Sequence, residues 1–196
     1  MPDESARMKQ KTLLLVRHAH TPMEGRFCGH SDPELSDRGR RQLPAIVEQL
    51  GDRYISGVYS SDLLRARQTA EPIASKFGLA IEVRPSLREI DFGAWEGLSW
   101  SEIEQRDSAF AAAWMADFPQ RTSPGGETFN DFERRVKEEL SAFANTEGEG
   151  CWVGVTHAGF IQASLSLVRR VAFRSIANVA YGAVVALSLT EEGWIG

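Results

Sequence analysis

A short apolar run, Thr12 to Val16, leads directly into the polar sequence Arg17-His18-Ala19-His20-Thr21. An uninterrupted apolar run of this length predicts a buried strand near the start of the chain. In open α/β sheets, ligands bind beyond the carboxyl ends of the strands. Because Arg17 and His18 stand at that end, this one feature predicts both a sheet and the position of a functional site.

Strand and helix patterns alternate along the rest of the chain. Short apolar runs predict further strands at 57–60, 79–83, 151–155 and 182–190, and helix-starting residues predict helices at 36–50, 61–77, 99–117, 128–145 and 158–171. Pro44 should make the first helix irregular, Ser61 or Asp62 should cap the second, and Gly78 should end it. This alternation predicts an α/β fold: a three-layer sandwich with a mainly parallel sheet and helices on both faces.

The length of 196 residues suits one domain covering the whole chain. Residues 1–11 are polar and are expected to form a disordered tail. The helical segment 95–145 resembles an insertion that walls the site. Its aromatic residues are expected to pack together rather than to bind a ligand; they are Trp95, Trp100, Phe110 and Trp114.

Charge and cysteine content restrict the class of protein. The net charge of −5 argues against nucleic acid or a membrane surface as partner, so an anionic ligand would need a locally basic pocket. Cys28 and Cys151 lie far apart without a CxxC motif, which favours a reducing compartment. The first apolar run is too short for a signal peptide or a membrane span. We expect a cytoplasmic protein, and the sequence leaves a homodimer open.

Three further positions offer partners for Arg17 and His18. Arg65 falls in the first turn of the second predicted helix, Glu89 follows an Arg-containing segment, and His157 directly follows a predicted strand. Parallel strands end at one crevice, where helix N-termini favour phosphate. Two histidines, two arginines and one carboxylic acid form a coherent set for phosphoryl transfer through a histidine nucleophile.

The chemistry assigns a role to each of these residues. His18 would attack phosphorus through a neutral ring nitrogen, while Arg17 and Arg65 would bind the non-bridging oxygens. His157 would donate a further hydrogen bond; such donors are each worth roughly 2.7–4 kcal/mol in the transition state. Glu89 would protonate the leaving alkoxide and then deprotonate the attacking water, which requires a raised pKa. This chemistry needs no metal and no organic cofactor.

Five segments resemble, in the correct order, the motifs of the histidine phosphatase superfamily. That superfamily includes cofactor-dependent phosphoglycerate mutases, fructose-2,6-bisphosphatase and α-ribazole phosphatase. The segments are 17–21, 29–42, 60–70, 87–97 and 155–159. The resemblance implies a phosphoglycerate mutase-like fold, with His18 as the phosphorylated nucleophile and Glu89 as the proton donor. It also implies a phosphate pocket formed by Arg17, Arg65 and His157.

The chain departs from the family pattern at three positions. Ala19 and His20 stand where the family usually has Gly and Glu, and Glu24 stands where many members carry an Asn that contacts phosphate. A carboxylate at position 24 would repel a second phosphate, which favours monophosphates.

Other residues in or near these motifs are candidates for substrate contact. Thr21, Gly29 and Ala158 are assigned to substrate binding. His20, His30 and Glu127 either contact substrate or have only a structural role.

The chain is shorter than typical mutases of the family, and this favours hydrolysis over phosphate transfer between hydroxyls. Segments 124–128 and 132–136 resemble α-ribazole phosphatases, which act late in cobalamin nucleotide-loop assembly. The sequence therefore predicts a metal-independent phosphatase of a small phosphorylated metabolite. The first candidate substrate is α-ribazole 5′-phosphate, and a sugar phosphate or a mutase activity is the alternative within the family.

Two functions of other classes stay open. His18 and His20 lie two residues apart, so both could bind a metal ion with His157 and an aspartate, as in a metal-dependent hydrolase. Against this, an adjacent arginine would repel the cation. A non-catalytic phospho-ligand binding module would be expected to have lost His18 or Glu89.

Overall fold

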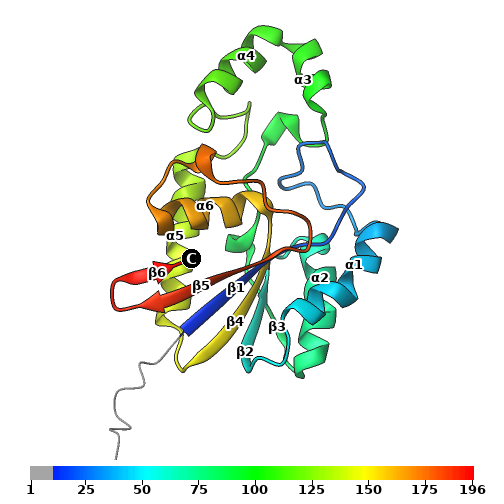
Figure 1. Ribbon diagram of the computed structural model, residues 1–196. Coiled ribbons are helices and arrows are strands. Elements are labelled where there is room, and N and C mark those ends of the chain that lie inside the picture. The colour runs from blue at the N-terminus through cyan, green and yellow to red at the C-terminus, as the bar shows by residue number, and fades with distance from the viewer. Residues whose placement is uncertain (1–10) are drawn as a thin grey trace, which may run out of the picture.

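The computed structural model describes residues 11–196, which form a six-stranded sheet with helices on both sides (Figure 1). The strands are β1 Lys11–Arg17, β2 Ile55–Ser60, β3 Ile81–Val83, β4 Gly150–Thr156, β5 Val184–Thr190 and β6 Gly193–Ile195. The α-helices are α1 Asp37–Gln49, α2 Leu64–Phe77, α3 Trp100–Arg106, α4 Ser108–Asp117, α5 Phe129–Asn145 and α6 Ala158–Arg169. Short 3-10 turns lie at Pro85–Leu87, Gly93–Trp95 and Phe173–Ser175.

The strand order is β3-β2-β4-β1-β5-β6. The first four strands in this order run parallel, whereas β5 and β6 are antiparallel to their neighbours. The predicted α/β architecture with a mainly parallel sheet is therefore confirmed. None of the helices in the described part of the chain is both long and apolar enough to cross a membrane.

The central strands of the sheet, β1 and β4, are buried on both faces because α1 and α2 cover one face and α5 and α6 cover the other (Figure 1). Alternate residues of β1 accordingly enter two separate cores. Leu14 packs toward α1 and α2, and Leu13 and Leu15 pack toward α5 and α6. Since successive side chains of a strand point to opposite faces, a strand between two helical layers needs an unbroken apolar run.

Helices α3 and α4 lie apart from the sheet, at the top of Figure 1, and have their own aromatic cluster. Trp95 and Trp114 are buried there, with Trp100 and Phe110 packed against them, as expected. The prediction of one helix over 99–117 is wrong, because the helix is interrupted at Asp107 and two helices form instead. Its carboxylate accepts a hydrogen bond from the Phe110 N–H and so caps a new helix.

Helix α5 belongs to the main body rather than to this projecting unit. Its apolar face packs into the larger core through Phe132, Val136 and Leu140. Of the predicted insertion 95–145, only the part before α5 therefore stands apart from the sheet.

The predicted cap of α2 is also wrong. The side chain of Asp32, from the loop after β1, accepts a 2.6 Å hydrogen bond from the Leu64 N–H. Asp62 is instead engaged by Arg88, with a 2.7 Å hydrogen bond to Oδ1, and Ser61 does not cap the helix. A distant residue thus replaces the local cap.

The remaining boundaries differ by a few residues. Helix α1 runs unbroken through Pro44, and α2 ends at Gly78 with φ of 64°, as predicted. Lys11, assigned to the tail, is the first residue of β1, and residues 1–10 lie outside the described residues. The sequence patterns did not predict β6, a three-residue strand that follows a tight turn without an Asn-Gly signal.

Candidate active site

The five residues expected to form the site lie together at the carboxyl ends of β1 and β4. The parallel register pairs Arg17 with Thr156, so His18 and His157 follow their strands at the same level. Their ring centroids are 5.1 Å apart. Arg65, in the first turn of α2, reaches His18 from the side, with Nε 3.3 Å from the Nε2 atom of the histidine. The topology thus unites residues from the whole length of the chain.

The His18 ring is oriented by the backbone. Its Nδ1 donates a 2.7 Å hydrogen bond to the Ala19 carbonyl, which leaves Nε2 as the unprotonated nitrogen. Burial, and next the positive charge of Arg65, hold the pKa of His18 well below its usual range. His18 is therefore a neutral imidazole with a lone pair on Nε2, which is the state that a histidine nucleophile requires.

Arg65 is fully buried and is held by a backbone loop. Its guanidinium donates to the carbonyls of Ser31 at 2.6 Å and Gly29 at 2.7 Å, and more weakly to that of Cys28 at 3.3 Å. Carbonyl partners orient the guanidinium without neutralising its charge. A buried guanidinium of this kind binds phosphate oxygens strongly.

The loop that holds Arg65 is itself organised by Glu96. The Glu96 carboxylate accepts hydrogen bonds from the N–H groups of Gly29 at 3.0 Å, His30 at 2.8 Å and Ser31 at 3.0 Å. It also accepts a 2.6 Å bond from the Ser31 hydroxyl. Burial acts to raise the pKa of Glu96, but the hydrogen bonds from Ser31 and its neighbours outweigh it and hold that pKa below its usual range. The sequence patterns assigned Glu96 no role.

Arg17 is supported by an aromatic ring that sequence reasoning also missed. Its guanidinium lies 3.7 Å from the ring centroid of Tyr181 and donates to the Val179 carbonyl. The same tyrosine ring lies 5.6 Å from that of His18. Tyr181 precedes the last long strand, and no local pattern distinguishes it from a packing residue.

Glu89 lies at the N-terminus of α6. Its carboxylate accepts hydrogen bonds from the Gly159 N–H at 2.8 Å and the Ile90 N–H at 3.0 Å. Burial raises the pKa of Glu89, and these two bonds together with Arg65 and Arg17 only partly oppose that effect. A raised pKa is what the expected role of proton donor requires.

His157 shares a 3.0 Å hydrogen bond with the Ser61 hydroxyl through Nε2. Its Nδ1 is buried without a hydrogen-bond partner, and so is Nε of Arg17; no other buried side-chain nitrogen or oxygen in residues 11–196 lacks one. Burial, and next the charge of Arg65, hold the pKa of His157 well below its usual range. Both unpaired atoms belong to the residue set that the sequence predicted.

A cavity of about 270 Å³ opens beside these groups. Its polar lining residues include Arg17, His18, Thr21 and Glu89. A second, mainly apolar cavity of about 230 Å³ also adjoins Glu89, and Ala158 lies in its wall. Thr21 and Ala158 are thus placed where substrate contact is feasible.

Gly29 packs behind the site, and its backbone groups bond to other residues of the protein. Its N–H bonds to Glu96, its carbonyl accepts from Arg65, and it lines neither cavity. A Cβ atom there would lie 2.1 Å from the Ile90 carbonyl oxygen, so the glycine permits close packing behind the site. The polar groups of Gly29 are thus already used within the protein, and its assignment to substrate binding stays a prediction.

His20 does not face the cavity either. Its Nε2 lies 2.9 Å from Glu24 and its Nδ1 lies 2.7 Å from the Ser36 hydroxyl. His18 and His20 therefore do not converge on one point, as the metal-dependent alternative would need. Among residues 11–196, no three His, Cys, Asp or Glu side chains gather as a group that could hold a metal ion.

The chain resembles known proteins in both sequence and structure. The family model "Histidine phosphatase superfamily (branch 1)" matches residues 13–195. Over 135 residues the chain is 41% identical to a bifunctional protein of Mycobacterium tuberculosis; the match covers 67% of this chain but only 37% of that protein. The chain is 33% identical over 168 residues to glucosyl-3-phosphoglycerate phosphatase of the same species, covering 80% of this chain and 74% of the relative. The crystal structure of α-ribazole phosphatase from Shigella flexneri matches with a TM-score of 0.86 and 26% identity, covering 94% and 93% of the two chains.

Proposed function

The chain belongs to branch 1 of the histidine phosphatase superfamily, and we propose that it hydrolyses small phosphomonoesters through a phosphohistidine formed on His18. The observation that carries this proposal is the pair of unpartnered buried atoms, Arg17 Nε and His157 Nδ1. Buried polar groups are nearly always hydrogen-bonded. A phosphoryl group beside His18 would supply several acceptor oxygens to these two residues.

The geometry supports a two-step reaction. In the first step, Nε2 of His18 forms a bond to phosphorus and the bond from phosphorus to the ester oxygen breaks. Glu89 gives its proton to that oxygen as the alcohol leaves. In the second step, Glu89 takes a proton from water, whose oxygen attacks phosphorus and releases His18 and inorganic phosphate. Arg17 and Arg65 bind the non-bridging oxygens throughout.

We propose α-ribazole 5′-phosphate as the first substrate to test, because the second cavity suits an aromatic group. Phe92, Phe118, Phe129 and Phe173 all line that cavity, and Glu89 is the charged residue in its wall. Stacked or edge-to-face aromatic contacts are worth about 0.5–1.5 kcal/mol beyond area burial. An ester whose alcohol carries an aromatic base could place that base here while Glu89 reaches its oxygen.

A phosphorylated carboxylic acid is the second candidate, and Arg26 favours it. Arg26 lines the same cavity as His18 and pairs with Glu102 at 2.9 Å, in an ion pair that is exposed to solvent. A substrate carboxylate could take the place of Glu102. The relative named glucosyl-3-phosphoglycerate phosphatase acts, by its name, on an ester that carries such a group.

We further propose that residues 11–196 act as one catalytic domain in which α3 and α4 wall the active site. Trp100 of α3 lines the cavity at His18, and Phe27 links this wall to the loop after β1. Thr21 is proposed to contact substrate from the same cavity.

The test is phosphate release from p-nitrophenyl phosphate with excess EDTA, for the wild type and His18→Ala. We expect release that survives EDTA and is lost in a variant with an unchanged circular dichroism spectrum. Activity that EDTA abolishes would instead support the metal-dependent hydrolase. Binding of inorganic phosphate without turnover of any small phosphomonoester would support the binding module. Initial rates with α-ribazole 5′-phosphate and with a phosphorylated carboxylic acid then separate the two substrate classes.

A further inference from the structure

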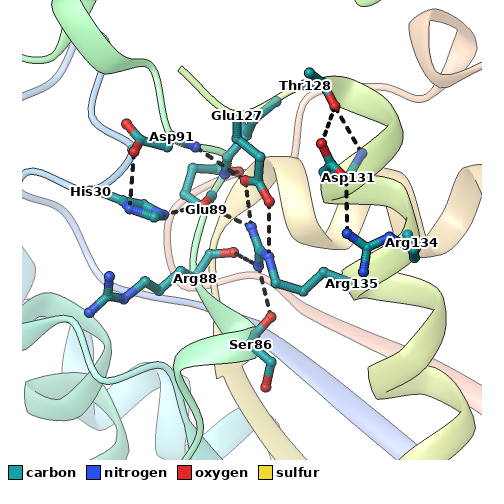
Figure 2. Close-up of polar contacts among 12 residues, drawn as sticks. His30, Ser86, Arg88, Glu89, Asp91, Glu127, Thr128, Asp131, Arg134 and Arg135 are labelled. Atoms are coloured by element: carbon teal, nitrogen blue, oxygen red, sulfur yellow. Dashed lines mark hydrogen bonds and ion pairs between the residues drawn. The ribbon is translucent and has the colours of Figure 1, made fainter. Parts of the chain in front are cut away.

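Glu127 and Arg135 form an ion pair beside the segment that carries Glu89 (Figure 2). Glu127 lies in the loop before α5, and Arg135 lies on α5 itself. Nη2 and Nε of the arginine lie 2.8 and 3.2 Å from the two carboxylate oxygens. Both side chains are only 19% exposed, and neither lines the two cavities. Direct contact with substrate therefore does not explain this half-buried pair.

The pair forms hydrogen bonds with several backbone carbonyls of residues 86–91, the segment that carries Glu89. Nη1 of Arg135 donates to the carbonyls of Ser86 and Arg88, each at 2.8 Å, and Nη2 donates to that of Glu89 at 3.3 Å. Glu127 donates its own N–H to the Asp91 carbonyl at 2.9 Å. A planar guanidinium with five fixed donors can hold several carbonyls at once, which a single ammonium cannot.

One peptide unit links Arg135 to the Glu89 carboxylate. The Glu89 carbonyl accepts hydrogen bonds from Arg135 and, at 3.2 Å, from Nε2 of His30 (Figure 2). The N–H of the same peptide unit, that of Ile90, donates to Oε1 of Glu89. Because the peptide unit is planar, the direction of its carbonyl also sets the direction of its N–H. Arg135 therefore fixes one of the two donors that hold the carboxyl group.

We propose that Arg135, held in place by Glu127, is a positioning residue that keeps the Glu89 carboxyl group within reach of the leaving-group oxygen. The inference rests on the proposed phosphatase function and extends it to a residue outside the site. General acid catalysis contributes about 10²–10⁴-fold, and a displacement of 1 Å can cost about 10²-fold. Loss of Arg135 should therefore lower kcat/KM mainly for substrates whose leaving group must be protonated.

Arg134 provides a matched control on the same helix. It is exposed and pairs with Asp131 at 2.8 Å and Glu138 at 3.5 Å, and Figure 2 shows its contact with Asp131 and none with the Glu89 segment. Replacement of either arginine removes the same charge from α5. Only replacement of Arg135 removes the bonds to the Glu89 segment.

The experiment compares kcat/KM for p-nitrophenyl phosphate and phenyl phosphate, which have similar shapes but a good and a poor leaving group. For Arg135→Gln we expect a loss about tenfold greater with phenyl phosphate than with p-nitrophenyl phosphate. For Arg134→Gln we expect the wild-type ratio. Arg135→Lys keeps the charge but loses the planar guanidinium with its several donors, so its ratio of losses for the two esters should fall between those of the other two variants. This variant provides the test if Arg135→Gln does not fold.

Equal losses with both esters would overturn the positioning role, because the arginine would then support only the fold or the phosphate pocket. A wild-type ratio in Arg135→Lys would also overturn it, since the several donors of the guanidinium would then not be needed to position Glu89. Failure of the proposed function would look different: the wild type itself would release phosphate from neither ester, and both proposals would fall together.

Discussion

The backbone N–H of Gly159 donates a 2.8 Å hydrogen bond to the carboxylate of Glu89, which lies 70 residues away in the chain. A Cβ atom at position 159 would lie 2.2 Å from Oε1 of that carboxylate. The absent side chain thus lets the N-terminus of α6 approach Glu89, where the N–H dipoles stabilise negative charge. Because His157 directly precedes α6, this contact also fixes the position of Glu89 relative to His157.

Gly159→Ala should displace Glu89 without disturbing α6. Alanine favours a helix over glycine by up to about 1 kcal/mol, so the backbone tolerates the change and the clash falls on the carboxylate. We expect kcat/KM for phenyl phosphate to fall at least about tenfold while helix content is retained. Steady-state kinetics with circular dichroism check this. Unchanged kinetics would mean that Glu89 reaches the leaving group from another position.

The pH dependence of turnover should have its alkaline limb set by Glu89. Burial raises the pKa of Glu89, and the acid acts only while protonated, so activity on a poor leaving group falls as pH rises through that pKa. The fall should begin above the usual range of a carboxyl group. A profile of kcat/KM against pH for phenyl phosphate measures it, and Glu89→Gln should remove this limb. Persistence of the limb in Glu89→Gln would assign it to another group.

The acid limb should lie unusually low because His18 must be neutral to attack phosphorus. Burial and the Arg65 charge hold the pKa of His18 well below its usual range, so protonation removes the nucleophile only in distinctly acidic solution. We expect activity at mildly acidic pH, where an unperturbed histidine is mostly protonated. The same pH series with p-nitrophenyl phosphate tests this. Loss of activity near the ordinary histidine pKa would show that His18 is not shielded as described.

Glu96→Gln should weaken the phosphate pocket rather than proton transfer. The carboxylate holds the loop whose carbonyls orient Arg65, and hydrogen bonds to charged groups contribute about 1.5–3 kcal/mol each. We expect weaker inhibition by vanadate and similar losses of kcat/KM for good and poor leaving groups, together with a lower free energy of unfolding in urea. A loss confined to poor leaving groups would link Glu96 to Glu89 instead.

The sequence predicted features with a local signal, and also residues such as Arg65, Glu89 and His157 that lie in recognisable motifs. The apolar run of β1 was enough to predict a buried strand, and the position of Arg17 and His18 at its carboxyl end was enough to predict the site. Glu96, Tyr181 and Arg135 were missed because neither a local pattern nor the chemistry of the motifs assigns them a role, and only the fold shows which partners they contact. Asp107 was misassigned since a helix break inside an apolar-rich segment depends on a single capping side chain.

The apolar cavity beside Glu89 should favour esters with an aromatic leaving group, and Phe173 tests this. Its side chain lines that cavity, and loss of an aromatic contact is worth about 0.5–1.5 kcal/mol, or roughly two- to thirteenfold in affinity. Phe173→Ala should raise KM for phenyl phosphate by that factor and leave KM for a small alkyl phosphate unchanged. Phe110→Ala is the control, because Phe110 packs in the α3–α4 cluster and lines neither cavity. Equal effects of the two variants, or an equal rise of KM for both esters, would place the leaving group elsewhere and favour the cavity that contains Arg26.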